Sequence, residues 1–247
     1  LMLLGQNVNA WDDGQHNFGT LLRTIAALPG LERLRYTTSH PRDVTGDMIR
    51  AHAELPQLMP YLHLPVQSGS DSVLQAMNRK YDRDGYLRLI ERFRAARPDL
   101  AITSDFIVGF PGETDRDFKD TLSIVGEVGY AQAFSFRYSP RLGTPAAERT
   151  DQIAPELQAE RLQRLQEAIG RSALAFNRAM IGQSTEILIE RRGRHPGQWI
   201  GKSPWLQSVV VQEAGLHIGE MVRVELLGAT ALSLEGRLLA REAGRQW

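Results

Sequence analysis

The stretch SDFIVGFPGETDRDF, residues 104–118, changes character at its middle. An apolar run that is typical of a buried strand ends at the glycine- and proline-containing turn Gly109–Gly112. Thr114 and Asp117 then have the spacing of a capping box, with Asp in the place of Glu, and predict the start of a helix. The stretch therefore predicts a strand, a tight turn and a helix, with the Glu113 carboxylate close to the end of the strand.

The same alternation extends over the first part of the chain, which predicts an α/β fold. Helix-like segments separate the candidate strands; in one of them Tyr86, Leu89, Ile90 and Phe93 share one helical face. Alternating strands and helices indicate a parallel sheet with crossover helices. Because the candidate strands are too few for a closed eight-stranded barrel, we expect an open, partial barrel over residues 1–154. The candidate strands are Leu1–Leu4, Arg33–Thr38, Tyr61–Val66, Ala101–Val108 and Ala133–Tyr138.

A change of pattern after residue 154 predicts two further parts. Pro155 suits the first turn of a long connecting helix over residues 155–181, and Gly182 suits its end. Short β-like runs with glycine-containing turns then follow: TEILIE, QWIGKS, QSVVVQ, MVRVELL and LSLEGRLL. This pattern predicts a small antiparallel β-barrel over residues 182–247.

Composition limits the possible functions. The chain has 247 residues, 42% of them hydrophobic, and a formal net charge of zero. No apolar run approaches the roughly 20 residues of a membrane span, so we expect no membrane partner and a cytoplasmic protein. The absence of cysteine excludes disulfides, thiolate metal ligands and thiol nucleophiles within this sequence. Because the chain opens on the apolar run LMLLG without an initiating Met, we expect that it lacks an N-terminal part.

Polar residues cluster at the carboxyl ends of the candidate strands, where parallel α/β folds bind ligands. Any one of them alone more often has a structural role, but all the predicted strand ends are polar at once. Dinucleotide, phosphate-loop, zinc-protease and serine-hydrolase motifs are absent. The residues concerned are Gln6, Asn7, Thr38, Ser39, His40, His63, Gln67, Ser68, Asp105, Glu113, Tyr138, Ser139 and Arg141.

Several blocks, in their order and spacing, resemble the radical S-adenosylmethionine methylthiotransferases. They are LLGQNVNAW, YTTSHP, HLPVQSGSD, SDFIVGFPGET and YSPRLGTPAA. The C-terminal part, with IGKSPWLQSVVV, resembles the TRAM domain of that family, a small RNA-binding, OB-like barrel. The resemblance is strongest to the members that add a methylthio group to carbon 2 of isopentenyladenosine, next to the tRNA anticodon. It therefore implies a transferase that modifies tRNA.

The resemblance also implies cofactors. In the family, a reduced 4Fe-4S cluster cleaves S-adenosylmethionine to a 5′-deoxyadenosyl radical, and a second cluster is present. Clusters of this kind need thiolate ligands. Since this chain has no cysteine, we expect both clusters to be held by residues that precede Leu1, and the chain alone to be inactive.

For S-adenosylmethionine, the resemblance and the chemistry of the cofactor together indicate a set of binding residues. Side-chain acceptors for its amino group are Gln6 and Asn7, and Asp105 is a further cofactor-binding candidate. Partners for its ribose and carboxylate are Ser39, Gln67, Ser68 and Arg141. An apolar wall and a backbone edge for the adenine come from Ile107, Val108, Gly109 and Phe110. Glu113 either contacts the cofactor or stabilises the following helix; the role of His63 and the catalytic residues stay open.

For RNA, the barrel offers aromatic side chains for stacking and cations for phosphate. The RNA-binding candidates are Arg191, Arg192, Lys202 and Trp205, with Trp199 and Arg194 nearby in the sequence. In the alternative interpretation, one or both tryptophans belong to the barrel core and the basic residues form a solvated turn. The expected partner is the tRNA anticodon stem-loop, and we expect the intact protein to be a monomer.

Two other functions stay open from the sequence. A sister methylthiotransferase would act on threonylcarbamoyl-adenosine in tRNA or on a ribosomal-protein aspartate. A non-catalytic RNA-binding protein derived from this fold would need no cysteine.

The barrel prediction leads to a binding experiment. Lys202→Ala should weaken the binding of unmodified tRNA and flatten its salt dependence, because one phosphate contact and its released counterion are lost. Filter binding over a series of salt concentrations measures both. Unchanged affinity and slope would remove Lys202 from the interface.

Overall fold

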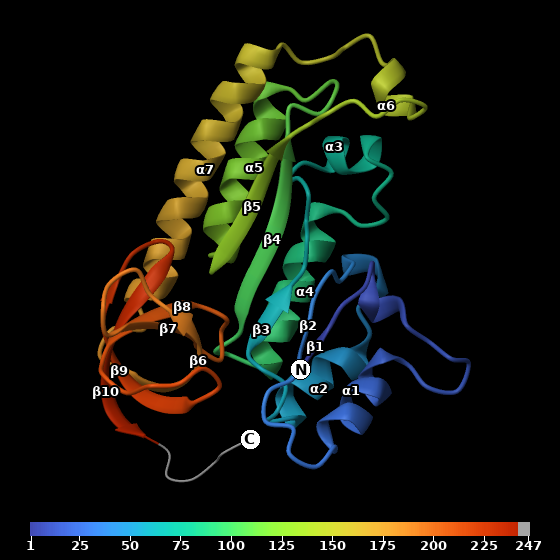
Figure 1. The fold of residues 1–247 in the computed structure, drawn as a ribbon. Helices are drawn as coiled ribbons and strands as arrows, with labels where there is room; N and C mark the ends of the chain where they lie inside the picture. Colours follow the sequence, from blue (N-terminus) through green and yellow to red (C-terminus); the bar gives the residue numbers. More distant parts are fainter. Residues whose placement is uncertain (242–247) are drawn as a thin grey trace. The chain divides into compact units, whose positions relative to one another are not determined.

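The computed structural model describes residues 1–241, which divide into two compact units (Figure 1). The first, called here the α/β unit, is Leu1–Gly170, and the second, the barrel unit, begins at Arg171. The division falls inside helix α7, Pro155–Arg178, whose start at Pro155 confirms the predicted helix start.

The α/β unit contains the five predicted strands, all paired in parallel. The strand β4, Ala101–Val108, has the predicted bounds. The strand β5 has the predicted length but lies one residue earlier, and β1, β2 and β3 are shorter than predicted. The strands β1 and β2 form one pair, and β3, β4 and β5 form a second sheet. A single bridge between Leu34 and Leu58 connects the two sheets, so the predicted open, partial barrel is confirmed. The bounds of these four strands are β1 (Met2–Leu3), β2 (Arg35–Tyr36), β3 (Tyr61–His63) and β5 (Gln132–Arg137).

Helices connect the strands. The short 3-10 turns η1 (Val8–Ala10) and η2 (Pro41–Asp43) follow β1 and β2. The α-helices are α1 (Phe18–Ala26), α2 (Gly46–Glu54), α3 (Asp71–Ala76), α4 (Arg83–Ala96), α5 (Asp115–Val128) and α6 (Pro145–Glu148), followed by α7.

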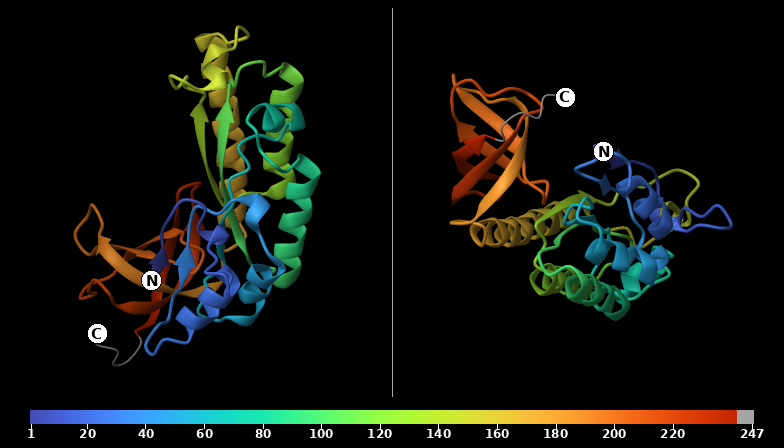
Figure 2. Two further views of the ribbon diagram at one scale, coloured as in Figure 1. Left: turned by 90° about the vertical axis from the view of Figure 1, so that its right-hand side faces the viewer. Right: turned by 90° about the horizontal axis from the view of Figure 1, so that it is seen from below.

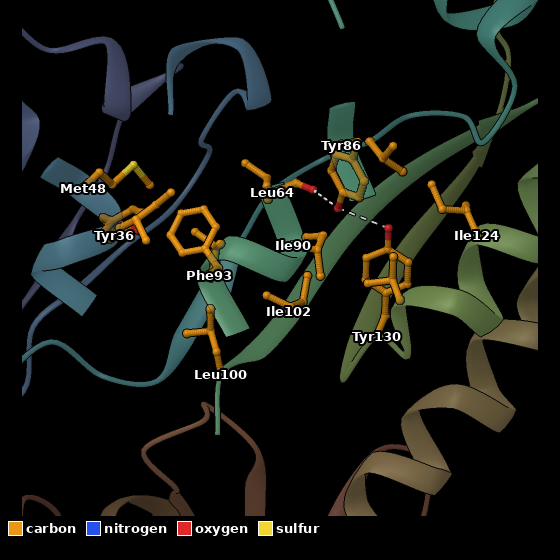
Figure 3. Packing of buried hydrophobic residues seen from close by; sticks show 14 of the residues in the cluster. Tyr36, Met48, Leu64, Tyr86, Ile90, Phe93, Leu100, Ile102, Ile124 and Tyr130 are labelled. Carbon is orange, nitrogen blue, oxygen red and sulfur yellow. Dashed lines mark hydrogen bonds between the residues drawn. The ribbon is translucent and has the colours of Figure 1, made fainter. Parts of the chain in front are cut away.

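The core of this unit lies between the sheet and its helices (Figure 3). On α4, Tyr86, Ile90 and Phe93 are buried, which confirms the predicted helical face. The phenol of Tyr86 donates a hydrogen bond to the Leu64 carbonyl at 2.9 Å, and the Tyr130 hydroxyl donates to the Tyr86 oxygen at 3.1 Å. These bonds satisfy phenolic groups that the core would otherwise leave unpaired.

Alternation along β4 separates the core from a second face of the sheet. Phe106 and Val108 are buried in the core, and because strand side chains alternate, Asp105 and Ile107 lie on the opposite face. Asp105 pairs with Phe134 and Ile107 with Phe136 in the register of β5. The face turned away from the core therefore carries a carboxylate next to exposed aromatic rings.

The barrel unit is a closed barrel in the order β10-β8-β7-β6-β9 (Figure 2). Its core contains aliphatic side chains at alternate strand positions, among them Ile187, Val209 and Val224. The pairs are antiparallel except β8 with β10, which is parallel. The predicted barrel is thus confirmed, with one parallel pair that the sequence pattern did not indicate. The strands are β6 (Ser184–Arg192), β7 (Gln198–Lys202), β8 (Ser208–Gln212), β9 (Met221–Ala229) and β10 (Ser233–Arg241). Residues 242–247 of the predicted domain lie outside the described residues.

Asp117 connects the starts of two helices. The predicted capping box is confirmed, because Thr114 and Asp117 each bond the other's backbone N–H group. Ser70 occupies the N-cap position of α3 without capping it; its hydroxyl instead donates to the Asp117 carboxylate at 2.5 Å. Burial alone would raise the pKa of Asp117, but hydrogen bonds from Ser70, Ser72 and Thr114 hold it at about 2.

The lowered pKa of Asp117 predicts a contribution to acid stability. A carboxylate with a depressed folded-state pKa stabilises the fold above its ordinary value of 3.8, and this stabilisation is lost as the pH falls towards about 2. Asp117→Asn should therefore lower the unfolding temperature at pH 5 and show a shallower decline between pH 4 and pH 2. Thermal unfolding followed by circular dichroism measures this. Asp120→Asn, on the same helix but outside both caps, is the control and should decline as the wild type does.

Candidate functional site

Left-handed backbone conformations mark the carboxyl ends of four strands of the α/β unit. Asn7, Thr38, Gln67 and Gly109 follow β1, β2, β3 and β4 with φ of 57°, 67°, 72° and 71°. Such a φ is uncommon for residues other than glycine, and it is a strong outlier for β-branched Thr38. Strain of this kind persists where the surrounding structure holds it, most often at functional sites. Three of the polar strand-end residues predicted from the sequence, Asn7, Thr38 and Gln67, thus also have strained backbone.

A hollow of about 760 Å³ opens at the ends of β3, β4 and β5. This volume is typical of sites for small ligands. Five of the predicted cofactor residues line it: Gln67, Asp105, Ile107, Phe110 and Arg141. The other lining residues are Ala76, Met77, Asn78, Arg79, Phe136, Arg137, Tyr138, Ser139, Thr144, Pro145 and Ala146.

The remaining cofactor predictions are not among the lining residues. Ser68 is fully buried and its hydroxyl contacts that of Thr121 at 3.1 Å, and Val108 is in the core. Gln6 is exposed after β1. The hollow therefore offers no contact with these three side chains.

Two predicted residues on the β1–β2 side carry buried polar atoms without a partner among the described residues. These atoms are the Asn7 Oδ1 and the Ser39 Oγ. The Asn7 amide donates to Asp43 at 2.6 Å, which leaves its oxygen as an acceptor. A buried polar atom without a hydrogen-bond partner costs free energy. These two atoms are therefore suited to hydrogen bonds with a ligand that has N–H and hydroxyl groups.

Both polar backbone groups of Gly109 are already used within the protein. Its N–H donates to the two Glu113 carboxylate oxygens at 3.1 Å, and its carbonyl accepts from the Gln158 amide at 3.2 Å. A Cβ at this position would lie 2.4 Å from Gln158 Cγ. Glycine is therefore required here by its positive φ and by the close approach of α7, rather than by an edge left free for adenine.

Glu113 has partners inside the protein rather than in the hollow. Its buried carboxylate pairs with the buried Arg161 guanidinium of α7 at 2.9 Å. Arg161 also donates to the Glu113 carbonyl and to Asp115 at 3.0 Å and 2.6 Å. Burial raises the pKa of Glu113, whereas the Gly109 N–H and Arg161 favour its ionised form. These contacts support a role of Glu113 in holding the fold rather than in contacting the cofactor. Nothing in the local sequence pointed to Arg161, almost fifty positions away.

His63 lies beside the hollow. Its Nε2 is 3.5 Å from the Asp105 carboxylate, and its Nδ1 is 3.0 Å from the Thr103 hydroxyl. The ring therefore lies next to the acidic side chain that lines the hollow.

The predicted RNA-binding residues of the barrel unit differ in their exposure and contacts. Arg191 and Arg192 are exposed, and the Arg192 guanidinium lies 5.3 Å from the centre of the buried Trp199 ring. Lys202 donates to the Ser208 hydroxyl at 2.9 Å, and Trp205 packs partly buried against the barrel core. A second hollow is lined by Arg192, Arg194, His195 and Trp199, among others. Arg192 is therefore the predicted residue that combines exposure with a concave basic surface.

Comparison with known proteins agrees with both units. Residues 1–125 match the model of the radical SAM superfamily. The chain belongs to the radical SAM superfamily. Residues 178–239 match the TRAM domain model. These matches confirm the resemblance that the sequence blocks indicated.

Two curated relatives from this superfamily are similar over almost the whole chain. Each is named tRNA-2-methylthio-N(6)-dimethylallyladenosine synthase. The one from Novosphingobium aromaticivorans is 58% identical over 243 residues, 96% of this chain and 55% of the relative. The one from Erythrobacter litoralis is 57% identical over 244 residues, 97% of this chain and 54% of the relative. The chain thus spans about half the length of these relatives.

The residues present fit one cofactor of the superfamily and not the other. The hollow, with its apolar wall, its carboxylate and its arginines, fits S-adenosylmethionine in size and chemistry. An iron–sulfur cluster does not fit, because the sequence has no cysteine. Within the described residues there is also no group of three or more His, Asp or Glu side chains suited to a metal ion. In the same part of the chain, no helix is both long and apolar enough to cross a membrane.

The buried pair between Glu113 and Arg161 predicts a large effect on stability. Arg161→Met leaves a buried carboxylate without its cation and should cost about 3–5 kcal/mol at neutral pH. The loss should shrink in acid, because the raised pKa of Glu113 allows it to take up a proton. Urea unfolding at two pH values measures both effects.

Arg164→Met is the matched control on the same helix. Arg164 pairs with Glu160 at 3.1 Å, and both side chains are about half exposed, so its loss should cost about 0.5 kcal/mol or less. Equal losses in the free energy of unfolding for the two variants would show that the buried pair stabilises the fold no more than the exposed pair does.

Proposed function

We propose that this chain supplies the cofactor-binding sheet and the RNA-binding barrel of a tRNA methylthiotransferase. The enzyme adds a methylthio group to carbon 2 of isopentenyladenosine, the nucleoside also called dimethylallyladenosine, next to the anticodon. The observation that carries the proposal is the identity of 57–58% with the two curated relatives, which runs through both units. The reaction takes place on cytoplasmic tRNA, and the intact protein acts as a monomer.

The hollow of the α/β unit is the proposed site of S-adenosylmethionine, which when bound supplies the methyl group and the radical chemistry of its superfamily. The Arg141 cation pairs with a carboxylate, and the Asp105 carboxylate accepts N–H or O–H donors. Ile107 and Phe110 form the apolar wall of the hollow. The chain's own contribution is to bind and orient the cofactor and to keep water from it.

The unpartnered atoms of Asn7 and Ser39 are further candidates for contacts with the cofactor amino group and ribose. The two 4Fe-4S clusters of the intact enzyme require thiolates that this sequence does not contain.

The barrel unit is the proposed contact for the tRNA anticodon stem-loop. Its match to the TRAM domain and the exposed Arg191 and Arg192 support this role. A buried tryptophan under Arg192 holds the guanidinium in a position to meet phosphate.

Mass spectrometry of tRNA nucleosides tests the proposed function. A strain from which the gene is deleted should accumulate isopentenyladenosine without its 2-methylthio group, and a plasmid copy of the complete gene should restore the group. Retention of 2-methylthio-isopentenyladenosine in the deletion strain would refute the proposal. Loss of the methylthio group from threonylcarbamoyl-adenosine instead would identify the sister activity.

A further inference from the structure

The imidazole ring of His40, in the loop after β2, faces an N–H donor with each of its two nitrogens. Its Nδ1 accepts from the backbone N–H of Arg42 at 3.2 Å, and its Nε2 lies 3.4 Å from Nη1 of Arg79, which can only donate. A neutral imidazole has one acceptor nitrogen, whereas an imidazolium has none. Since hydrogen bonds from charged donors are the stronger, the contact with Arg79 requires a neutral ring that accepts at Nε2.

The backbones of His40 and Arg79 are both anchored. The buried Asn9 of η1 donates its amide to the His40 carbonyl at 3.0 Å and accepts from the His40 N–H at 2.8 Å. Arg79 follows the left-handed Asn78, and its N–H donates to the Leu74 carbonyl of α3 at 2.9 Å, as in a Schellman motif. The contact between the two side chains therefore joins two fixed segments that are 39 residues apart in the sequence.

Arg79 also belongs to the wall of the hollow. Its Nη1 is directed to His40, whereas its Nε is buried and has no hydrogen-bond partner among residues 1–241. A buried donor without a partner costs free energy until a ligand or water accepts from it. The planar guanidinium group matches a carboxylate with paired N–H donors. Arg79 is therefore suited to hold a carboxylate in the hollow while His40 fixes the orientation of its guanidinium group.

The groups around His40 disfavour its protonation. Burial and then the Arg79 cation lower the pKa of His40, Asp43 raises it, and Arg42 lowers it further. The ring of Tyr81 packs edge to face against His40 with 5.6 Å between ring centres, and burial raises the pKa of its phenol to about 12, so it adds no charge. His40 is therefore neutral at neutral pH and takes up a proton only in acid.

We propose that neutral His40 is a positioning residue for Arg79, and that the hollow loses affinity for a carboxylate-bearing ligand when His40 takes up a proton. The inference rests on the proposed function, in which this ligand is S-adenosylmethionine, and adds a pH dependence to it. A protonated ring cannot accept from Arg79 and places a second positive charge beside it, so the guanidinium group turns away. The affinity is therefore full above the lowered pKa of His40 and falls as the pH drops through it.

Equilibrium dialysis of labelled S-adenosylmethionine measures this dependence without any turnover. The protein is expressed from the complete reading frame that contains this chain and is kept without reductant. Between pH 5 and pH 7 the carboxylate and the ammonium group of the cofactor both stay charged, so a change in Kd reports on the protein. The Kd of the wild type should rise about tenfold from pH 7 to pH 5, the effect of one lost charge-assisted hydrogen bond.

Two substitutions of His40 separate the positioning of Arg79 from the capping of η2. The amide of glutamine can take the place of Nε2, so His40→Gln keeps an acceptor for Arg79 that does not titrate. Its Kd should stay near the wild-type value at pH 7 and change little down to pH 5. The amide of asparagine can take the place of Nδ1, so His40→Asn keeps the cap and loses the contact with Arg79. Its Kd should be about tenfold higher than that of the wild type at pH 7 and should change little with pH.

Further variants control for other causes. Arg79→Gln should behave as His40→Asn does, and in the double variant the two effects should not add, because they remove the same contact. His217→Gln is the matched control, because His217 is an exposed histidine of the barrel unit; it should keep the wild-type pH profile. His63, beside Asp105, is a second histidine near the hollow, and any contribution from it would persist in His40→Gln.

The outcomes distinguish this inference from the proposed function. A wild-type Kd that does not change between pH 7 and pH 5, a pH dependence that persists in His40→Gln, or additive effects of His40→Asn and Arg79→Gln would each overturn the role of His40. All three would leave the proposed function standing. Failure of the intact protein to bind S-adenosylmethionine at any pH would refute both.

Discussion

The buried carboxylate of Glu113 is the constraint on which the α/β unit depends. A charge enclosed by protein must be paired and hydrogen-bonded, because the free energy lost on leaving water is otherwise not recovered. Glu113 meets this condition through the Gly109 N–H on one side and Arg161 on the other. The turn after β4 and the first turns of α7 are thus held by one pair of side chains, and Phe110, inside that turn, becomes part of the wall of the hollow.

The two faces of the sheet separate the residues of the core from those that line the hollow. Along β4, Phe106 and Val108 pack into the core, while Asp105 and Ile107 face the hollow. Since successive side chains of a strand point to opposite faces, residues of the core and residues of the hollow alternate along β4. Left-handed residues follow the carboxyl ends of β1 to β4, the edge of a parallel sheet at which ligands bind.

Among the described residues that line the hollow, three are arginines and one is an aspartate. Arg137 is the last residue of β5, Arg141 follows β5, and Arg79 follows α3, so the guanidinium groups reach the hollow from different segments.

The sequence alone determined the elements whose causes are local. The apolar run Ala101–Val108 followed by Gly-Phe-Pro-Gly specified a strand and its end, and the spacing of Thr114 and Asp117 specified a helix start, because both depend on groups a few residues apart. The polar strand ends were also visible, which identified five residues of the hollow. Tertiary structure alone decided which of them share it. Ser68 meets Thr121, and Gly109 meets Gln158 and Glu113, so their polar groups are used inside the fold. Arg161, Arg79 and Arg137 gave no local signal, since an arginine in the sequence does not indicate whether it lies in solvent, in a buried pair or on the wall of a hollow. Their surroundings are formed by segments far apart in the chain, and only the folded packing brings those segments together.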